Sequence, residues 1–413
     1  MISGHRLIRA RVVLTQTTPP IEDGAVLIQQ GEIVKVGFYR DLASASVEER
    51  IDLGEQILLP GLINAHCHLD YTGMRNKIPS EKNFSQWIQR IIALKNAQNH
   101  KDYLAAIEEG FKELRHWGTT SVFNIGFIPE AMEGLPTPAM RTWWFHELID
   151  IRFPVYMEKL VGNVLAFSKK HPTWLGAFGL SPHAPYTVSR DLYKRVKCYA
   201  EKHDLPVTTH LAETSEELEM FREGCGHLFD FLKGLGRPMR DCKTKSPVAI
   251  LLEESLLPRG SILVHMNALD EADWAIIRRH ASDFMVVHCP KTHSYFGRDK
   301  FHFAELRKSG VSICLGTDSL ASNDSLNLFE EMRLFLRLHE VTEQEVLNMV
   351  TLHSAKAIGW EGRLGIIAAG ACADLIAIPY SGKIRDTVAA VVNHSQPIGW
   401  SMVGGMQNEM PIG

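Results

Sequence analysis

The sequence predicts an α/β fold in which a (β/α)8 barrel of the TIM type carries a small β-sandwich domain built from both chain ends. From residue 57 onward, eight short apolar segments typical of buried strands alternate with amphipathic helical segments. Both ends of the chain are instead rich in β-forming residues. No Gly-x-Gly-x-x-Gly motif follows the early strands, which disfavours an open, doubly wound dinucleotide-binding sheet.

Residues 1–56 are expected to form the N-terminal part of the small β domain. Their composition predicts strands at 7–14, 24–29 and 32–38, and Gln30-Gly31 predicts the turn between the last two. Helical periodicity occurs in this part of the chain only at 41–50.

Residues 57–363 are expected to form the barrel. The apolar run at 57–63 predicts its opening strand, and seven further buried strands are predicted at 119–125, 140–148, 175–183, 206–213, 261–268, 283–289 and 311–318. Helical segments lie between them at 103–117, 155–170, 190–203, 271–280 and 326–338. Two connections are long. The connection at 71–115 holds an extra helix at 84–97 that could cover the barrel mouth, and the glycines of 223–257 predict a loop.

Residues 364–413 are expected to form the C-terminal part of the small β domain. Two helical stretches at 343–352 and 354–358 precede them, and strands are then predicted at 373–378, at 387–393 and from 401 onward. The simplest arrangement pairs the two chain ends in one domain beside the barrel.

The composition narrows the class of protein. The chain has 413 residues, 45% of them hydrophobic, and a formal net charge of −4, so no basic field suggests a nucleic-acid or anionic-membrane partner. We expect a small-molecule substrate, and the sequence leaves homo-oligomerisation open. The first ten residues contain no apolar core of a signal peptide, so we expect none, and no uninterrupted run of about 18 apolar residues suggests a membrane span. The seven scattered cysteines form no Cys-x-x-Cys and predict a reduced, cytoplasmic protein.

Two histidines end the opening strand. His66 and His68 are two residues apart, and on a strand this spacing places both imidazoles on one face. They can therefore share a metal ion.

Later strands end in the same chemistry. His210 ends the fifth predicted strand and Asp318 ends the eighth, and the strand ends of a barrel converge on one face. Three imidazoles and a carboxylate suit Zn²⁺ or Fe²⁺ and leave a position for water. We therefore expect one divalent metal ion, with zinc favoured. Glu213 follows His210 by three residues, and a closed structural metal site would not need this free acid.

Three more histidines lie at comparable strand ends, namely His183, His265 and His288. They cannot all bind one tetrahedral ion, so some must contact the substrate or support the ligands. Strand four ends in His183 without a lysine nearby, which does not support a modified lysine bridging two metal ions.

Several motifs together resemble those of the amidohydrolase superfamily. They are Pro-Gly-Leu-Ile-Asn-Ala-His-Cys-His (60–68), Thr-His-Leu-Ala-Glu (209–213), Val-His-Met-Asn (264–267), His-Cys-Pro-Lys-Thr (288–292), Leu-Gly-Thr-Asp-Ser-Leu-Ala-Ser-Asn (315–323) and Gly-Ala-Cys-Ala-Asp-Leu (370–375). The branch that the chain resembles most contains S-adenosylhomocysteine, aminodeoxyfutalosine and guanine deaminases and the triazine hydrolases, which include chlorohydrolases. Relatives often read His-Cys-Pro-x-Ser-Asn where this chain has His288-Cys-Pro-Lys-Thr-His293, so the usual contacts after strand seven are not carried over.

The resemblance implies a role for each site residue. His66, His68, His210 and Asp318 match the metal ligands. Glu213 matches the acid that protonates the ring nitrogen, His265 a residue that orients the water or the oxyanion, and His183 a substrate contact. Asp318 can also accept the proton of the attacking water.

The sequence therefore predicts a metal-dependent hydrolytic deaminase that releases ammonia from an aminated heterocycle. An adenine nucleoside such as adenosine, S-adenosylhomocysteine or aminodeoxyfutalosine is favoured. Trp87 on the extra helix is expected to wall the site, and Arg152 past strand three is expected to meet an acidic tail. The alternatives are a guanine or triazine deaminase, a chlorohydrolase, a cyclic-amide hydrolase with the same metal site, and a binding protein with a structural metal.

Overall fold

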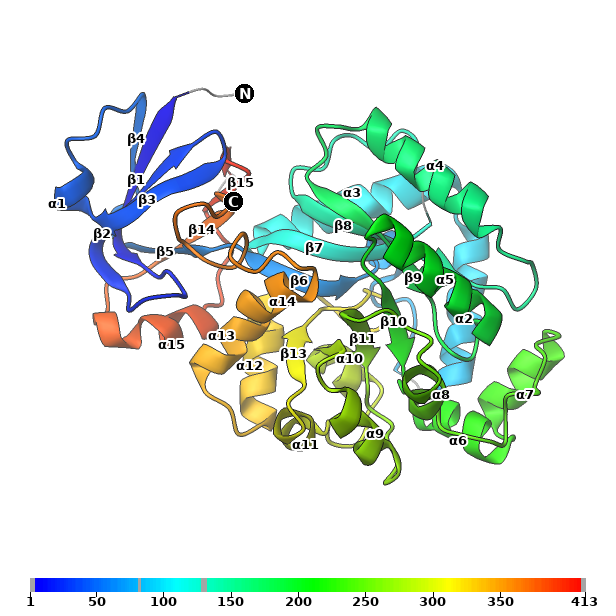
Figure 1. Ribbon diagram of the computed structural model, residues 1–413. Coiled ribbons are helices and arrows are strands. Elements are labelled where there is room, and N and C mark those ends of the chain that lie inside the picture. The colour runs from blue at the N-terminus through cyan, green and yellow to red at the C-terminus, as the bar shows by residue number, and fades with distance from the viewer. Residues whose placement is uncertain (1–3, 81–82, 128–131, 410–413) are drawn as a thin grey trace.

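The computed structural model describes residues 4–80, 83–127 and 132–409, which form a mixed α/β structure (Figure 1). Strands from both chain ends make one eight-stranded sheet, seen at the left of Figure 1, in the order β16-β15-β14-β5-β1-β2-β3 with β4 beside β1. Its strands are β1 (His5–Val13), β2 (Ile21–Gln29), β3 (Glu32–Phe38), β4 (Glu49–Asp52), β5 (Gln56–Pro60), β14 (Leu375–Pro379), β15 (Trp400–Val403) and β16 (Met406–Glu409). The expected pairing of the two chain ends is confirmed.

The hairpin of β2 and β3 turns at the predicted dipeptide. Gln30 and Gly31 have φ values of 51° and 83°. Positive φ at both central residues is the requirement of a type I′ turn, whose twist matches that of the flanking strands. Glycine at the second position adopts this conformation without a steric cost.

Eight parallel strands form two further sheets, in the orders β6-β7-β8-β9 and β10-β11-β12-β13. Single parallel bridges join the sheets at both edges, Leu180 to Val207 and Cys67 to Asp318. The strands are β6 (Leu62–Cys67), β7 (Thr119–Gly126), β8 (Arg141–Leu148), β9 (Gly176–Pro182), β10 (Thr208–Leu211), β11 (Ser261–His265), β12 (Phe284–His288) and β13 (Ser312–Leu315). Nearly all their residues are buried, as expected for parallel strands covered on both sides.

Helices surround the parallel strands in Figure 1. They are η1 (Leu69–Met74), α2 (Phe84–Ala97), α3 (His100–His116), α4 (Met157–Lys170), α5 (Arg190–His203), α6 (Ser215–Glu223), α7 (His227–Gly234), α8 (Pro247–Glu253), α9 (Asp273–His280), α10 (Pro290–Tyr295), α11 (Phe303–Lys308), α12 (Leu328–Leu338), α13 (Glu343–Met349), α14 (Leu352–Ala357), η3 (Ile384–Asp386) and α15 (Thr387–Val392). The short helix α1 (Tyr39–Leu42) instead lies against β2 and β3. Both α2 and α5 have the predicted bounds. Within the described residues, no α-helix joins β7 to β8, although helical sequence was expected after each strand. None of the described helices is long and apolar enough to cross a membrane.

The apolar run at 57–63 is not one strand. β5 pairs with β1 and β14 in the sheet of the chain ends, and β6 begins the parallel strands after Gly61. A Cβ at Gly61 would lie 2.1 Å from the Thr120 hydroxyl oxygen, so only glycine fits where the chain changes sheet. Uniform apolarity hid this change, because strands of both sheets are buried here. The expected boundary at residue 57 therefore falls inside β5.

Three other segments differ from the sequence expectation. The predicted strand at 387–393 is helix α15, because Thr387 and Val391 lie on one helical face that packs near α13. The predicted loop at 223–257 contains α7 and α8, and its first glycine, Gly224, instead ends α6 in the left-handed conformation. Only the short α1 and then β4 occupy the region around 41–50.

Candidate active site

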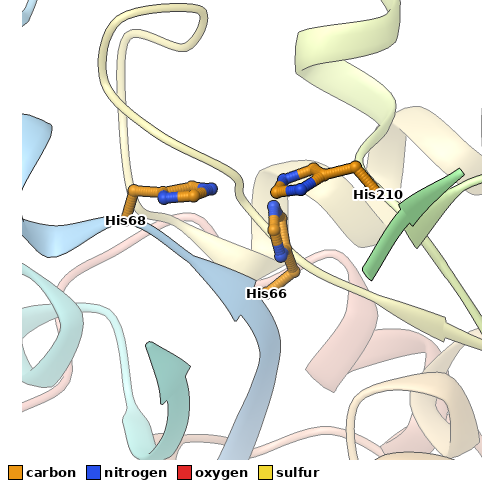
Figure 2. A group of neighbouring side chains, drawn as sticks. All are labelled: His66, His68 and His210. Atoms are coloured by element: carbon orange, nitrogen blue, oxygen red, sulfur yellow. The ribbon is translucent and has the colours of Figure 1, made fainter. Parts of the chain in front are cut away.

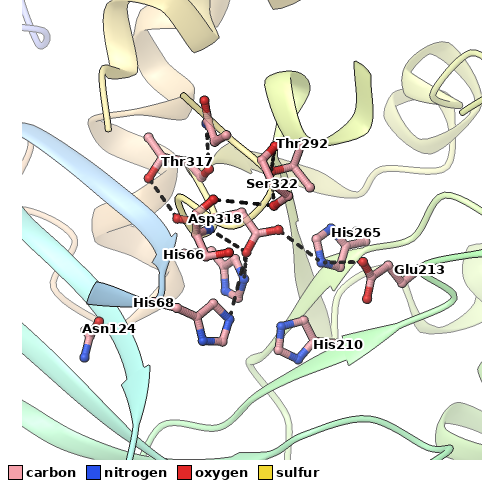
Figure 3. A network of polar contacts seen from close by, with 12 residues as sticks. His66, His68, Asn124, His210, Glu213, His265, Thr292, Thr317, Asp318 and Ser322 are labelled. Carbon is pink, nitrogen blue, oxygen red and sulfur yellow. Dashed lines mark hydrogen bonds and ion pairs between the residues drawn. The ribbon is translucent and has the colours of Figure 1, made fainter. Parts of the chain in front are cut away.

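The carboxyl ends of the parallel strands bring the predicted metal ligands together. His66 lies in β6, His68 follows it, and His210 lies in β10. The backbone N–H groups of Thr317 and Asp318 donate to the His66 carbonyl oxygen at 3.2 and 3.0 Å, which holds the chain after β13 against the end of β6. All four expected ligands therefore share one buried site (Figure 3).

The imidazoles of His66, His68 and His210 point toward one another (Figure 2), with one ring nitrogen of each within 4.8 Å of the others. The Oδ1 atom of Asp318 lies 3.5 Å from Nε2 of His66 and 4.0 Å from Nε2 of His68. Ligand atoms of a tetrahedral ion with bonds of about 2.0–2.2 Å lie roughly 3.3–3.6 Å apart. The buried Nε2 of His66 has no hydrogen-bond partner among the described residues, as expected of an atom that faces a metal ion. The donor set thus fits a divalent ion.

The protonation states also fit a metal. Burial lowers the pKa values of His66 and His68, so both rings are neutral near pH 7, the form that binds metals. Burial by itself would raise the pKa of Asp318, but the adjacent His66 imidazole, His210 and the Ser319 N–H, which donates to Oδ1 at 2.8 Å, hold it below its usual value. His210 Nδ1 lies 2.9 Å from the His183 carbonyl oxygen, so Nδ1 carries the hydrogen and Nε2 presents its lone pair to the site.

Glu213 and His265 continue this network away from the metal ligands. The Nε2 atom of His265 lies 3.7 Å from Oε1 of Glu213 and 4.0 Å from Oδ2 of Asp318 (Figure 3). Burial raises the pKa of Glu213, which favours a carboxyl group that can carry a proton. Arg298 opposes this effect, because its Nη2 donates to Oε1 of Glu213 at 2.9 Å.

The backbone is strained where these side chains leave the strands. Ala212, His265, Met266 and Asp318 all have positive φ values, of 49°, 82°, 50° and 57°. Non-glycine residues adopt this region at an energetic cost that the surrounding structure must offset, and such residues cluster at functional sites. The bends aim Glu213, His265 and Asp318 into one site.

A cavity of about 200 Å³ opens beside the metal ligands. Its wall includes apolar residues of α2, which are Phe84, Trp87, Ile88, Ile91 and Ile92, and residues in and after α7, which are Phe231, Leu232 and Leu235. The cavity also reaches His68, His210, Glu213, His265 and Asp318. A substrate in it would meet the metal ligands at one side and apolar surface at the other.

Two predicted substrate contacts line the cavity. Trp87 is buried in its wall and donates from Nε1 to the Ala321 carbonyl oxygen at 3.3 Å, which fixes the indole ring. His183 also lines it, and its Nδ1 lies 2.6 Å from the Thr187 hydroxyl oxygen, which leaves Nε2 for a ligand.

The structure does not bring Arg152 to the cavity. Ile149 and Ile151 line it, while Arg152 is exposed and absent from the lining. The chain bends at 151–153, just past β8, and Arg152 is exposed in this bend. Nearness in sequence to a strand end was therefore a misleading signal for this residue.

His288 and His293 also lie outside the cavity lining. The His288 ring stacks on Phe301 with centroids 3.8 Å apart. His293 Nδ1 lies 3.1 Å from the Asn267 Oδ1 atom, and burial lowers the pKa of His293 to about 4. His288 belongs to the packing behind the site, whereas His293 lines a neighbouring cavity that Glu213 and Arg298 also line.

Sequence reasoning missed four polar residues near the site, namely Tyr71, Lys95, Glu147 and Arg298. Glu147 could have been found, because it lies near the carboxyl end of a predicted strand, as His210 does. Lys95 lies in a helix and Arg298 in a loop, where no strand-end pattern marks a site residue.

Comparison with known proteins gives relatives along nearly the whole chain. A 5-methylthioadenosine/S-adenosylhomocysteine deaminase of Syntrophobacter fumaroxidans is 30% identical over 380 residues, which are 87% of this chain and 80% of that protein.

Three solved structures share the fold. They are a zinc-bound adenosine deaminase from Xanthomonas campestris (TM-score 0.82, 23% identity, 97% of this chain and 92% of that one), an aminofutalosine deaminase of Helicobacter pylori in complex with methylthio-coformycin (0.82, 21%, 98% and 100%) and a triazine hydrolase from Arthrobacter aurescens (0.82, 21%, 99% and 96%). At these identities the structures establish the fold alone.

The model of the amidohydrolase family matches residues 57–399, which span all eight parallel strands and every residue of the site. The resemblance seen in the motifs is thereby confirmed, and the chain belongs to the amidohydrolase family.

Proposed function

We propose that this protein is a metal-dependent hydrolase that removes the amino group of an adenine nucleoside derivative and releases ammonia. One observation carries the proposal: the buried acid Glu213, at the cavity wall, is linked through His265 to Asp318 among the metal ligands. The relatives named as deaminases of 5-methylthioadenosine, S-adenosylhomocysteine and aminofutalosine support the nucleoside as substrate.

The architecture that we propose is a closed (β/α)8 barrel with a smaller β-sandwich domain. The bridges at both edges of the two parallel sheets support closure. The eight-stranded sheet of the chain ends supports a second domain, whose boundaries we place at Gly61, where the chain changes sheet, and near residue 363.

His66, His68, His210 and Asp318 are the proposed ligands of one divalent ion, and the zinc-bound structural relative supports zinc. When bound, zinc lowers the pKa of a water ligand from 15.7 to about 7 and so supplies hydroxide at neutral pH. The net charge of −4 gives no basic field, and the proposal therefore includes neither a nucleic-acid nor a membrane partner. Seven free cysteines support a reducing, cytoplasmic location.

The residues of the chain divide the proton transfers. Glu213 holds a proton on its carboxyl group and delivers it to the ring nitrogen beside the carbon under attack, because burial favours its protonated form. Asp318 is ionised, because its pKa is lowered, so it accepts a proton from the attacking water and passes it to the amino group, which leaves as ammonia. Glu213 regains its proton from the hydroxyl group on the ring carbon as the carbonyl forms. His265 lies between the two acids and orients the water and the developing oxyanion.

His183 and Trp87 position the heterocycle, and the apolar residues of α2 and α7 exclude bulk water from the cavity. Arg298 keeps the Glu213 carboxyl group in one orientation through its hydrogen bond at Oε1.

The test combines metal analysis with ammonia release by the purified protein. We expect about one zinc ion per chain and ammonia from adenosine, 5-methylthioadenosine or S-adenosylhomocysteine. Guanine, melamine and a chlorotriazine represent the alternative substrates. Ammonia from guanine or melamine alone would overturn the nucleoside as substrate, and chloride release or ring opening without ammonia would overturn deamination. Two tightly bound ions per chain would overturn the single-metal site.

A further inference from the structure

Strand β8 carries a buried acid that the proposed chemistry does not use. Glu147 is 6% exposed and lines the cavity. Its carboxylate makes no hydrogen bond or ion pair with any residue in the described part of the chain. Burying a carboxylate without a partner is costly, so a group that enters the cavity is the natural hydrogen-bond donor to it.

A lysine of helix α2 lines the same part of the cavity. Nζ of Lys95 donates to the Tyr71 hydroxyl oxygen at 2.9 Å, and an ammonium group has three hydrogens to donate. Burial alone would lower the pKa of Lys95, but Tyr71, Glu147 and Asp70 raise it above its usual value. Lys95 is therefore a cation at neutral pH with hydrogens left for a ligand.

Lys95 and Glu147 do not form an ion pair within 4.0 Å in the described structure. Glu147 still raises the pKa of Lys95 through its charge, although the two groups are not in contact. Arg141, in the same strand as Glu147, by contrast forms a direct ion pair with Asp374 at 2.8 Å. We call Lys95 and Glu147 the polar wall.

The polar wall lies on the side of the cavity toward His68, away from Glu213. The Tyr71 ring, which binds Lys95, stacks on the His68 ring at a centroid distance of 5.3 Å and an interplanar angle of 6°. β8 also holds β9 beside it, because the backbone N–H of His183 donates to the Leu148 carbonyl oxygen at 3.0 Å. Glu147, Lys95 and His183 thus border a region next to the reacting centre but distinct from Glu213.

The charges of the wall limit which ligand group it can hold. A single carboxylate, phosphate or ammonium group would be attracted by one member of the wall and repelled by the other. A hydroxyl group can donate to Glu147 and accept from Lys95 at once, and two adjacent hydroxyls satisfy both partners with good geometry.

We propose that the polar wall binds the vicinal hydroxyl groups of the substrate's sugar, with Glu147 as acceptor and Lys95 as donor. This proposal rests on the proposed nucleoside function and assigns the part of the substrate that the wall selects. The wall therefore sets a requirement for a ribose diol, while the metal site and Glu213 act on the base.

The test compares adenosine with 2′,3′-dideoxyadenosine, which differ only in the diol. For the wild type we expect kcat/KM for adenosine to be at least 100-fold higher. The Glu147→Gln substitution removes the charge at nearly constant size, so it should lower kcat/KM for adenosine at least 10-fold, mainly through KM. It should change kcat/KM for the dideoxy compound less than 3-fold. Lys95→Met should reduce the discrimination in the same direction.

Glu109→Gln is the matched control, because Glu109 is exposed on α3 and, among the described residues, forms an ion pair with Lys112 alone. Metal content and the thermal midpoint report whether each variant folds, and Lys95→Met carries the test if Glu147→Gln does not fold. Titration calorimetry with inosine and 2′,3′-dideoxyinosine gives a readout that needs no turnover, and the variants should lose the preference for inosine.

The outcomes separate the two proposals. If the wild type deaminates both nucleosides equally and Glu147→Gln changes neither, the polar-wall proposal fails and the deaminase function stands. If no nucleoside releases ammonia but inosine binding depends on Glu147 and Lys95, the function fails and the wall stands. Turnover of guanine or melamine without nucleoside turnover or inosine binding overturns both.

Discussion

The two ends of strand β8 carry buried charged groups, of which one has an ion-pair partner and the other has none among the described residues. Near its amino end, Nε and Nη2 of Arg141 donate to the two carboxylate oxygens of Asp374 at 2.8 and 3.1 Å, and the Gly404 N–H donates to the same carboxylate at 2.7 Å. Near its carboxyl end, Glu147 has no such partner in the described residues. Both charges are buried to a similar extent, so burial alone does not reveal their roles.

The difference lies in whether the protein completes the interaction. Arg141 and Asp374 tie the parallel strands to the sheet of the chain ends, and the bidentate pair leaves neither charge for a ligand. Glu147 and the Nε2 atom of His66 have no hydrogen-bond partner among the described residues, and both belong to the site at the carboxyl ends of the strands. A buried polar group without a partner at the carboxyl ends of the strands therefore indicates ligand binding. A buried polar group whose partners are all supplied by the protein indicates a structural role.

The largest expected effect is on turnover and comes from a substitution in the site at the carboxyl ends of the strands. Glu213→Gln keeps the size of the side chain but removes the proton that it delivers, so turnover should fall by about 10²–10⁴-fold. Metal content and thermal midpoint should stay at the wild-type values, because Glu213 is not among the proposed metal ligands. Ammonia release and elemental analysis check both parts.

The matched control is Glu223→Gln at the exposed end of α6, which should leave turnover within 2-fold. If Glu213→Gln retained more than a tenth of wild-type turnover, Glu213 would not be the acid. Loss of the metal together with turnover would place Glu213 in the metal site instead.

The second prediction concerns the ion pair of Arg141 and Asp374 at the amino end of β8. Arg141→Met leaves the buried Asp374 carboxylate without its cation, and breaking a buried pair in this way typically costs about 3–5 kcal/mol of unfolding free energy. The folded variant should keep kcat and KM within about 2-fold, because the pair lies away from the cavity lining. Urea unfolding and steady-state kinetics of the same preparation measure both quantities.

The double variant Arg141→Met with Asp374→Asn should be less destabilised than the sum of the two single variants, since neither charge is then left alone. Additive effects would show that the two residues do not act as a pair.

Much of the site follows from one rule, that chemistry-bearing residues at the carboxyl ends of parallel strands meet. It led from sequence to His66, His210 and Asp318, which the structure brings together. The same rule could have selected Glu147, but a lone acid in a buried strand has no spacing partner to distinguish it, whereas His66 has His68.

Other features depend on packing that no local pattern records. Lys95 reaches the cavity because α2 packs over it, with the Phe84 ring 5.6 Å from Trp87 and 5.8 Å from Phe296. The segment at 387–393 has a high intrinsic preference for strand, which its packing near α13 overrides. Apolarity predicted the buried strands well, but it could not tell β5 from β6, because both are buried in different sheets.

The smallest predicted effect concerns Glu217, a buried acid directly behind the site. Its Oε2 atom accepts a hydrogen bond from the Glu213 N–H at 2.8 Å, while Oε1 has no partner among the described residues. Glu217 thus has a hydrogen-bond partner at one carboxylate oxygen only, whereas Asp374 has partners at both and Glu147 has none among the described residues. Burial raises the pKa of Glu217 to about 8, against 4.5 in an exposed side chain.

The folded state therefore holds this proton more tightly than the unfolded state does. The contribution of Glu217 to stability is greatest below about pH 4.5 and is lost as the pH rises toward 8, with a slope of about 1.4 kcal/mol per pH unit between these values. Glu217→Gln cannot titrate, so the wild type should lose about 1 kcal/mol of unfolding free energy relative to this variant between pH 6.5 and 7.5. Urea unfolding of both proteins at the two pH values measures the difference. If the unfolding free energy changed equally in the two proteins, Glu217 would already be ionised at pH 6.5. Its carboxylate would then be stabilised by the protein, as that of Asp374 is.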